Sequence, residues 1–363
     1  MGGAHIHGAV SGVTAGELSA PVSASAHQAP RGTDYARLSR LVRQAGLLDR
    51  RPGHYTWRIT ITVGLLVGGW AAFLLVGDSW WQLAVAVYLA VIFTQLGFLG
   101  HDAGHRQITR SRRVSYILGI LLGNLGIGLS YGWWVNKHNR HHANPNTEGA
   151  DPDIMMKALA MTASQASASS GLSRIIFRCQ AYLFFPMLLG EAASLHVASI
   201  KALAERGGRG RRRPAEIVLL GLHIAGYLTI VFAVLSPARA IIFILVQQGL
   251  FGFYMGVSFA PNHKGMPILQ PQDENDFLRR QVLTSRNVRG GWFTDLALGG
   301  LNYQIEHHLF PSMPRPSLSR SKALISDFCR QEGLPYCETS LVRSYAQALG
   351  YLNAVGRQAT RTT

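Results

Sequence analysis

Three short histidine-rich patterns are the part of this sequence best suited to chemistry. They are His101-Asp102-Ala103-Gly104-His105, His138-Asn139-Arg140-His141-His142 and Gln304-Ile305-Glu306-His307-His308. Side chains three or four residues apart share one face of a helix, so the polar side chains within each pattern would point together. Neutral imidazole is a ligand for iron, copper and zinc. The patterns therefore predict helices that hold metal ions.

Chance alone produces part of this spacing. With 14 histidines in 363 residues, a His-x-x-x-His pair is expected about 0.5 times, whereas His-x-x-His-His is expected only about 0.02 times. The alternative interpretation, surface or core histidines that bind nothing, has to account for three such patterns at once. We therefore favour a metal site.

The composition indicates that the helices carrying these patterns lie in a membrane. The chain is 48% hydrophobic and only 15% charged, with a mean hydropathy of +0.12, whereas soluble domains carry about 25% charged residues. This excludes a disordered chain and argues against an ordinary cytosolic enzyme. The three cysteines form no Cys-x-x-Cys pair and give no disulfide framework, which fits the reducing side of a membrane.

Four apolar runs are long enough to span a bilayer, which takes about 20 residues. Two short joints, Asp78-Ser79 and Ser236-Pro237, force neighbouring runs into helical hairpins. The sequence therefore predicts an all-α integral membrane protein with four transmembrane helices. The expected spans are residues 57–77, 80–100, 215–235 and 238–260.

The net charge of +16 comes largely from arginines beside the outer ends of the hairpins. A charge of this size is also typical of nucleic-acid binding, but its distribution matches the positive-inside pattern, so we expect no nucleic-acid partner. The N-terminus, the 201–213 loop and the C-terminal part are then cytoplasmic, and we expect a multi-pass protein of a bacterial-type plasma membrane. Residues 1–30 are expected to be a disordered tail, and residues 34–50 an amphipathic helix on the membrane surface.

Two further apolar stretches do not fit simple spans. Residues 114–135 are interrupted by five glycines, and a crossing there would put the first two histidine patterns on opposite membrane faces. We therefore expect this stretch to be re-entrant or interfacial, with its irregular backbone covered by protein. Residues 175–195 are broken by Arg178 and Pro186, and we expect them to be interfacial.

The histidine patterns beside two hairpins closely resemble those of the membrane-bound fatty acid desaturases. The resemblance runs from about Asp34 to the region of Arg320, and Gln304, with Gly299-Gly300-Leu301-Asn302-Tyr303 and Leu309-Phe310-Pro311 around it, is similar to the front-end branch. It implies a desaturase domain at residues 31–330, in which a cytoplasmic helical cap holds two iron ions, and a cytoplasmic tail at 331–363. The implied reaction uses O2 to remove two hydrogens from adjacent methylenes of a long acyl chain carried on coenzyme A or a lipid.

The same resemblance implies the metal ligands. Carried over by position, they are His101, His105, His138, His141, His142, His307 and His308. An eighth ligand follows the fourth span in the family, and here the candidate is His263, for which an ordinary loop histidine is the alternative. Gln304 could bind the metal or hydrogen-bond a metal-bound water, and Asn262 is a similar candidate.

Carboxylates near the patterns could orient metal-bound imidazoles through their free N–H, although each could equally be solvated or cap a helix. The candidates are Asp102, Glu148, Asp151, Asp153 and Glu306. Aromatic side chains beside the patterns could line an acyl tunnel, although aromatic residues are common near any membrane interface. They are Trp133, Trp134, Tyr254, Phe259 and Trp292. His196 and His223 are expected outside the site, His223 as a neutral imidazole bonded to a neighbouring helix.

The electron supply is expected to be a separate protein. Front-end desaturases of eukaryotes often carry a fused haem domain marked by His-Pro-Gly-Gly, and this sequence lacks that motif. The resemblance then implies a ferredoxin or a flavin reductase as donor, and the many arginines could bind an acidic one. Two alternatives stay open: a hydroxylase of the same superfamily, and a metal-binding membrane protein without turnover.

Overall fold

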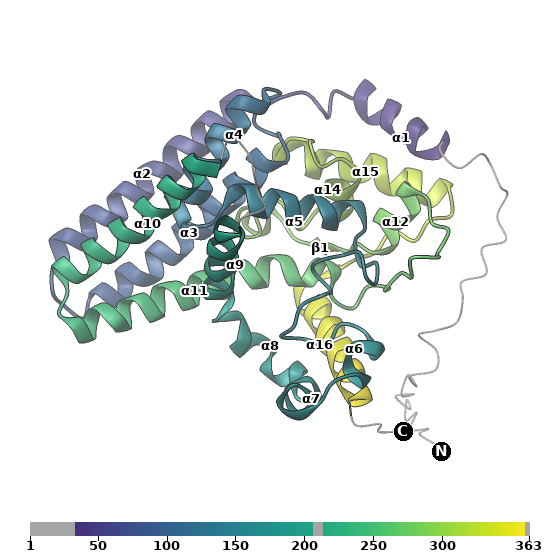
Figure 1. Cartoon of the computed structure of the whole chain (residues 1–363). Helices are drawn as coiled ribbons and strands as arrows, with labels where there is room; N and C mark the ends of the chain where they lie inside the picture. Colours follow the sequence, from purple (N-terminus) through teal and green to yellow (C-terminus); the bar gives the residue numbers. More distant parts are fainter. Residues whose placement is uncertain (1–32, 206–212, 360–363) are drawn as a thin grey trace, which may run out of the picture.

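The structure is a computed structural model that describes residues 33–205 and 213–359, and almost all of its regular elements are helices (Figure 1). The expected tail at residues 1–30 and the arginines of residues 206–212 lie outside the described residues. The elements in chain order are α1 (Thr33–Gln44), α2 (Pro52–Val76), α3 (Gln82–Gly104), α4 (Arg112–Ile120), the π-helix η2 (Leu121–Gly126), α5 (Tyr131–Ala143), α6 (Ala163–Ser167), α7 (Gly171–Arg178), α8 (Gln180–Leu188), α9 (Glu191–Ala204), α10 (Arg213–Val234), α11 (Pro237–His263), α12 (Phe277–Leu283), β1 (Asn287–Arg289), α13 (Trp292–Ala297), α14 (Gln304–Leu309), α15 (Arg315–Gln331), β2 (Glu338–Ser340) and α16 (Leu341–Gln358).

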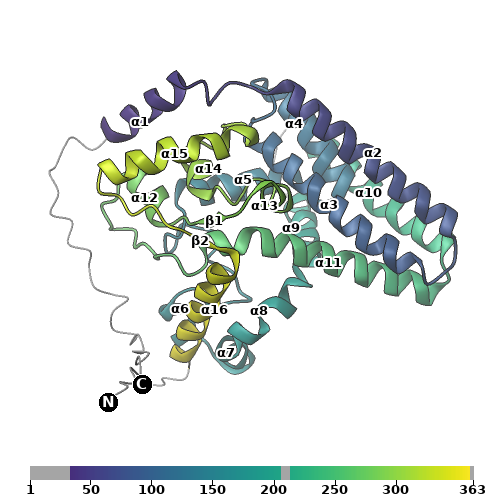
Figure 2. The ribbon, with the colours of Figure 1, turned by 180° about the vertical axis from the view of Figure 1, so that it is seen from behind.

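Four helices, α2, α3, α10 and α11, are long and apolar enough to cross a membrane. They form the two expected hairpins and lie side by side at one end of the molecule (Figures 1 and 2). The hairpin tips are joined, because Asp78 accepts a hydrogen bond from the Ser236 amide at 3.0 Å and pairs with Arg239 at 2.6 Å. Outward-facing side chains such as Leu75 and Val218 are 88% and 59% exposed. This large apolar exterior fits a lipid environment.

The helices extend beyond the expected spans. Helix α2 begins at Pro52, and α3 and α11 continue to Gly104 and His263. The expected bounds followed the apolar residues alone, whereas helical hydrogen bonding continues through the polar residues that flank them. Pro52 can begin α2 because proline is well tolerated in the first turn of a helix. The consequence is that the ends of α3 and α11, rather than loops, carry histidines.

The stretch at residues 114–135 does not run straight. Helix α4 continues into η2, and α5 then leaves at an angle of 112°. The turn is closed by a hydrogen bond from the Leu129 amide to the Gly123 carbonyl, and Gly128 adopts a positive φ of 69°. The Ser130 side chain then caps α5 by accepting a hydrogen bond from the Trp133 amide. The chain thus turns back by more than a right angle, which fits the re-entrant or interfacial path that we expected.

The second irregular stretch is also bent, by 71° between α8 and α9. Helix α7 ends at Arg178, as expected. Pro186, in contrast, lies inside α8, and the next break comes only after Leu188. Pro186 lacks the amide that would donate to the carbonyl of Tyr182, so it costs α8 one intrahelical hydrogen bond.

A separate apolar core lies beside the spans, where α1, α12, α14 and α15 pack together. Leu38 and Val42 of α1 are fully buried against Ile325 and Phe328 of α15 and their neighbours. The apolar side of α1 is therefore covered by protein, which corrects our expectation that it faces the membrane surface. Below this core, β1 pairs in parallel with β2, with Val288 opposite Thr339.

Residues 331–359 are not a tail, which corrects the expected domain boundary. After β2, helix α16 packs against α6, α7, α8 and α11. Leu352 is fully buried, and its carbonyl accepts a hydrogen bond from Gln180 at 2.9 Å. The amphipathic pattern of α16 needs a partner surface, and the bent helices α7 and α8 supply it.

Candidate metal centre

Eight histidines meet in one cluster at the ends of α3 and α11. Helix α3 brings one in its last turn and one just after its end, α5 brings three, α11 one and α14 two. They are His101, His105, His138, His141, His142, His263, His307 and His308. The structure thus brings together all eight histidines that the sequence singled out, from positions up to 207 residues apart (308 minus 101).

Within the cluster, the ring nitrogens form two groups in which they lie within 4.8 Å of one another. The first histidine group consists of His101, His105, His138 and His307. The second histidine group consists of His141, His263 and His308. His142 lies between them, with its ring centroid 4.5 Å from that of His105 and 4.2 Å from that of His308. The arrangement therefore offers two adjacent sites.

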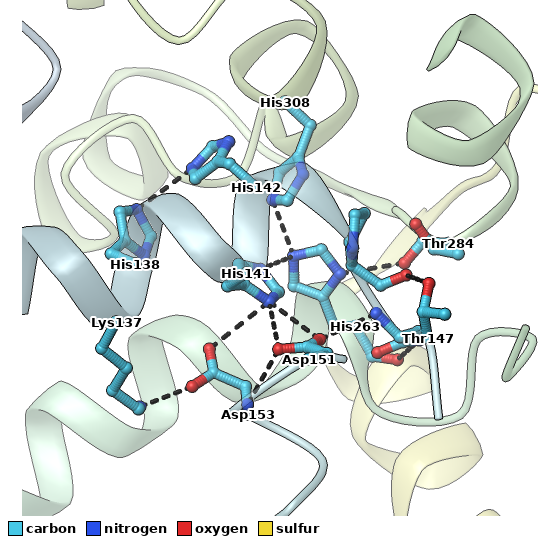
Figure 3. Close-up of polar contacts among 12 residues, drawn as sticks. Lys137, His138, His141, His142, Thr147, Asp151, Asp153, His263, Thr284 and His308 are labelled. Atoms are coloured by element: carbon cyan, nitrogen blue, oxygen red, sulfur yellow. Dashed lines mark hydrogen bonds and ion pairs between the residues drawn. The ribbon is translucent and has the colours of Figure 1, made fainter. Parts of the chain in front are cut away.

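Helical periodicity explains why neighbouring histidines serve different groups. Consecutive residues on a helix point about 100° apart, whereas residues four apart share a face. On α5, His138 and His142 approach each other with their Nε2 atoms 3.1 Å apart, and His141 points elsewhere, toward the second histidine group (Figure 3). On α14 the adjacent pair His307 and His308 divides in the same way.

A close approach of α3 and α5 lets their histidines meet. A Cβ atom on Gly104 would lie 2.6 Å from a ring carbon of Trp134, closer than side chains pack. The Trp134 ring is stacked on His138, with centroids 4.5 Å apart. The glycine in the first histidine pattern is thus required by the second, because it leaves room for the aromatic ring that supports His138.

The second histidine group is held by acceptors on its outer side. The Nδ1 atoms of His141, His263 and His308 lie 2.9 Å from Asp151, 2.9 Å from the Thr284 carbonyl and 2.8 Å from Gln281 Oε1. Because a carboxylate and a carbonyl can only accept, these contacts place the imidazole proton on Nδ1 and leave the lone pair on Nε2. The sequence singled out Asp151, but its spacing gives no signal for Gln281 or Thr284.

The three Nε2 atoms of this group face one another. The Nε2 of His263 lies 3.4 Å from that of His141 and 3.0 Å from that of His308. Three lone pairs cannot hydrogen-bond to each other, so a cation between them would relieve their repulsion. The second histidine group therefore fits a metal ion by its donor atoms.

The first histidine group also fits a cation. The Nε2 atoms of His101, His105 and His307 are buried and, among the described residues, have no hydrogen-bond partner. Buried polar atoms without a partner are rare and costly. Burial also lowers the pKa of His105 and His307 well below the usual value, with nearby histidines adding to the effect, so both imidazoles are neutral and able to bind metal.

Asp102 connects the first group to α15. Its carboxylate pairs with Arg315 at 2.6 Å, and both side chains are buried. The other oxygen lies 3.5 Å from His101 Nδ1, too long for a strong hydrogen bond. Asp102 thus lies beside His101, but its main partner is the arginine.

Asp153 lies next to His141 and has a second charged partner. One oxygen is 3.5 Å from His141 Nδ1, and the other is 2.5 Å from the ammonium of Lys137 (Figure 3). Burial opposes ionisation, but the positive charge of Lys137 holds the pKa of the Asp153 carboxyl well below its usual range. Lys137, which the sequence did not single out, therefore lies one carboxylate away from the cluster.

Two expected carboxylates do not touch a histidine. Glu306 is buried but turns away from the cluster and accepts hydrogen bonds from Asn287 at 2.8 Å and Tyr336 at 2.5 Å. Glu148 bonds Ser164 and Gln270 on the protein surface. Neither residue therefore orients an imidazole, which corrects our expectation for both. Glu306 precedes His307 by one position on α14, so its side chain projects about 100° away from that histidine.

Gln304 and Asn262 lie at the second histidine group. The amide nitrogen of Gln304 is 2.8 Å from His263 Nε2, and Gln304 Oε1 accepts a hydrogen bond from Asn262 at 3.2 Å. Both side chains are buried. They therefore form a polar link at the edge of the group.

An apolar cavity of about 250 Å³ reaches the histidine cluster. It is lined by His101, His138, His141 and His263 at one side and by side chains of α3, α8, α9 and α11 elsewhere. Of the expected tunnel aromatics, Trp134 and Phe259 line it, whereas Trp133 and Tyr254 do not. Trp292 is 78% exposed, so its tunnel assignment is corrected. Helix α13, which carries it, has no buried residue.

His196 and His223 lie outside the cluster, as expected. His196 Nδ1 is 2.8 Å from the Gly128 carbonyl, and His223 Nδ1 is 2.8 Å from the Leu125 carbonyl. His223 thus satisfies a carbonyl in the last turn of η2 and His196 one just after it, where regular helical bonding stops. The irregular backbone at this point therefore explains why His196 and His223 are present.

Comparisons with known proteins agree with this geometry. A family model described as fatty acid desaturase matches residues 78–340, which include the whole histidine cluster. A Delta(8)-fatty-acid desaturase of Euglena gracilis is 29% identical over 340 residues, covering 90% of this chain and 80% of that protein. A Delta(5) fatty acid desaturase of Caenorhabditis elegans is 32% identical over 305 residues, covering 81% and 67%. A Delta 8-(E)-sphingolipid desaturase of Emericella nidulans is 27% identical over 348 residues, covering 89% and 62%.

Proposed function

This chain belongs to the fatty acid desaturase family, and we propose that it uses O2 to introduce a double bond into a long fatty acyl chain, at two iron ions held by the eight histidines. The observation that carries the proposal is the position of the apolar cavity. Four histidines of the cluster line it, so an acyl chain lying in it would have methylenes beside the proposed metals.

We assign one iron to the first histidine group and one to the second, with His142 between them. Iron bound there would supply the oxidising power needed to break an unactivated C–H bond. The protein's own contribution is orientation: Asp151, Gln281 and the Thr284 carbonyl fix the imidazole planes of the second group. Gln304 and Asn262 are proposed to hydrogen-bond groups at the edge of this site.

The cavity supports the reaction by excluding water. Its lining includes Met255, Phe259, Leu188 and Leu195, which bind a chain of methylenes without offering hydrogen-bond partners. A dry surrounding strengthens every electrostatic interaction at the cluster. Long acyl chains carried on coenzyme A or on a lipid both meet these requirements.

For the electron donor we propose a separate acidic protein of the ferredoxin or flavin-reductase type. An open pocket of about 720 Å³ adjoins His105 and is lined by Arg106, Arg112 and Asn139, among others. Arg112 is the first residue of α4, where the helix dipole disfavours a cation. Its charge is therefore not explained by helix stability and suits an acidic partner close to a proposed iron ligand.

The remaining assignments follow from the distribution of charge. By the positive-inside pattern, we propose that the histidine cluster and the cap formed by α12 to α15 lie on the cytoplasmic side of a bacterial-type plasma membrane. The four long apolar helices support a multi-pass arrangement.

The test is product analysis in a host that expresses the chain with a ferredoxin and its reductase. We expect a new unsaturated fatty acid by mass spectrometry with double-bond location, its loss in the His141→Ala, His142→Ala variant, and two irons per purified chain. Hydroxylated chains would instead identify a hydroxylase. Iron binding without oxygen consumption would identify a protein without turnover, and an iron content near zero would contradict the di-iron proposal.

A further inference from the structure

The apolar cavity contains four charged side chains close to the histidine cluster. Among its lining residues, those with a formal charge are Lys137, Asp153, Glu191 and Lys264, which we call the charged quartet. They come from α5, the loop after it, α9 and the residue that follows α11. Four positions between residues 137 and 264 thus place their charges in one largely apolar space, which the histidine cluster also lines.

Only part of the quartet is explained by pairing within the protein. Lys137 pairs with the Asp153 carboxylate at 2.5 Å, and Lys264 donates a hydrogen bond to the Asp153 main-chain carbonyl at 3.1 Å. The Glu191 side chain makes no hydrogen bond or ion pair with any residue that the structure describes. Charged groups are costly to bury unless they are paired, and the ammonium groups retain unused donors. Glu191 and Lys264 therefore have hydrogen-bonding capacity that folding does not use.

The side chains of the central pair face open space. Lys137 and Asp153 are 34% and 35% exposed although they lie inside the protein, because they line the cavity. A molecule in the cavity would meet them directly. The two positive and two negative charges cancel. A substrate group with a full charge would therefore be attracted by the two residues of opposite sign and repelled by the two of like sign.

We propose that the charged quartet is a subsite for the uncharged polar end of the acyl substrate, namely the carbonyl of a thioester, ester or amide and any N–H or O–H beside it. A carbonyl oxygen would accept a hydrogen bond from Lys264 or Lys137, and an N–H or O–H would donate to Glu191. This subsite rests on the proposed function, because it positions the same acyl chain at the same histidine cluster.

The position of the quartet determines which carbons reach the cluster. The Asp153 carboxylate touches Lys137 with one oxygen and lies 3.5 Å from His141 Nδ1 with the other. The quartet therefore lies on the Nδ1 side of His141, and a substrate carbonyl held there would be at a fixed distance from the proposed irons. The double bond would then be introduced at a fixed distance from the carbonyl, whatever the total chain length.

A purely structural role is the competing interpretation. Asp153 beside His141 could serve only to orient that imidazole, with Lys137 balancing its charge. This accounts for Lys137 and Asp153 but leaves Glu191 and Lys264 unexplained. These two residues are accordingly the ones to test.

The first experiment compares substrates of different length on the wild-type enzyme. Acyl chains of 16, 18 and 20 carbons with the same carrier should all acquire the double bond at the same carbon counted from the carbonyl. A position that stays constant from the methyl end instead would overturn the subsite while leaving desaturation itself established. The absence of any unsaturated product from a chain that binds two irons would contradict the proposed function, so the two failures are distinguishable.

The second experiment uses Glu191→Gln and Lys264→Met. We expect the KM for the acyl substrate to rise about tenfold, the cost of one hydrogen bond to a charged group, and the single double-bond position to become a mixture, while the iron content stays at two. Matched controls are Glu205→Gln and Lys157→Met, which remove the same charges from exposed positions that do not line the cavity. If Lys264→Met does not bind iron, the result for Glu191→Gln is by itself the test. With an amide substrate, whose N–H is proposed to donate to Glu191, an unchanged KM and an unchanged single position in Glu191→Gln overturn the proposal.

The carrier is identified by three substrates with one acyl chain: the coenzyme A thioester, the phosphatidylcholine ester and the ceramide amide. Turnover of any of these in preference to the free fatty acid supports the subsite, since all three present an uncharged carbonyl. Preference for the free fatty acid, whose terminal carboxylate is charged, overturns it.

Discussion

The buried guanidinium of Arg286 donates two hydrogen bonds to the main-chain carbonyl of Pro261, from Nε at 3.0 Å and from a terminal nitrogen at 2.5 Å. The same terminal nitrogen donates to the Lys264 carbonyl at 2.8 Å. Carbonyls in the last turn of a helix have no intrahelical partner. Arg286 thus satisfies the end of α11 on both sides of His263. Helix α16 completes the contact, since Gln347 accepts a hydrogen bond from Arg286 at 2.8 Å.

Replacing this arginine should release His263. We expect Arg286→Met to leave the Lys264 carbonyl without its partner and the Pro261 carbonyl with Ser344 alone, to lower stability by about 3 kcal/mol, and to reduce bound iron from two toward one per chain. Thermal unfolding in detergent and iron analysis measure the two effects. Arg289→Met, three residues further along the chain in β1, is the control, because Arg289 is 70% exposed in a surface ion pair and should change neither value.

Removal of the carboxylate behind His141 should weaken metal binding without removing a ligand. Asp151 accepts from His141 and also from the backbone amides of Asn146 and Asp153 at 2.7 and 2.8 Å. We expect Asp151→Asn to lower iron affinity by about 10- to 100-fold, measured by competition with a chelator. Glu148→Gln changes a carboxylate of the same loop that touches no histidine, and equal losses in both variants would contradict the role of Asp151.

The two histidine groups should lose iron independently. His307 belongs to the first group and its neighbour His308 to the second. We expect His307→Ala and His308→Ala each to retain about one iron per chain and to abolish product formation, since the reaction needs both sites. Metal analysis of purified protein is the measurement. His196→Ala, outside the cluster, should keep both irons, and two irons in either cluster variant would contradict the grouping.

The close approach at Gly104 should be intolerant of a methyl group. Gly104→Ala would push Trp134 away from its stacked position on His138, and we expect a loss of about 2 kcal/mol from overpacking together with reduced iron at the first group. Gly68→Ala on α2 is the matched control, because its Cβ would meet nothing within 4 Å. Similar unfolding temperatures for the two variants would argue against the contact.

Charge reversal at the open pocket should weaken the electron donor. We expect Arg112→Glu to raise the concentration of ferredoxin needed for half-maximal activity about tenfold at low salt, with a smaller effect at high salt because screening weakens surface charges. The rate with a small chemical reductant should not change. Arg343→Glu, an exposed arginine on α16, serves as control, and an effect of equal size there would exclude a local docking site.

Features that depend on short-range order could be predicted from the amino-acid sequence. Four apolar runs and two short joints predict two hairpins, because helix length and bilayer thickness are matched locally. The histidine spacings predict shared helical faces, and the rarity of these spacings indicates a metal site. The bend after η2 was also expected, from the glycines that interrupt an apolar stretch.

Which residues act together depends on contacts that only the folded chain makes. Asp151 and Glu306 were equal candidates in the sequence, yet one touches His141 and the other faces Asn287, since packing between helices determines which side of α14 meets the cluster. The same holds for Arg286 and α16, whose partners lie tens of residues away in sequence. Local periodicity places a side chain on a face of its own helix, but long-range packing determines what that face meets.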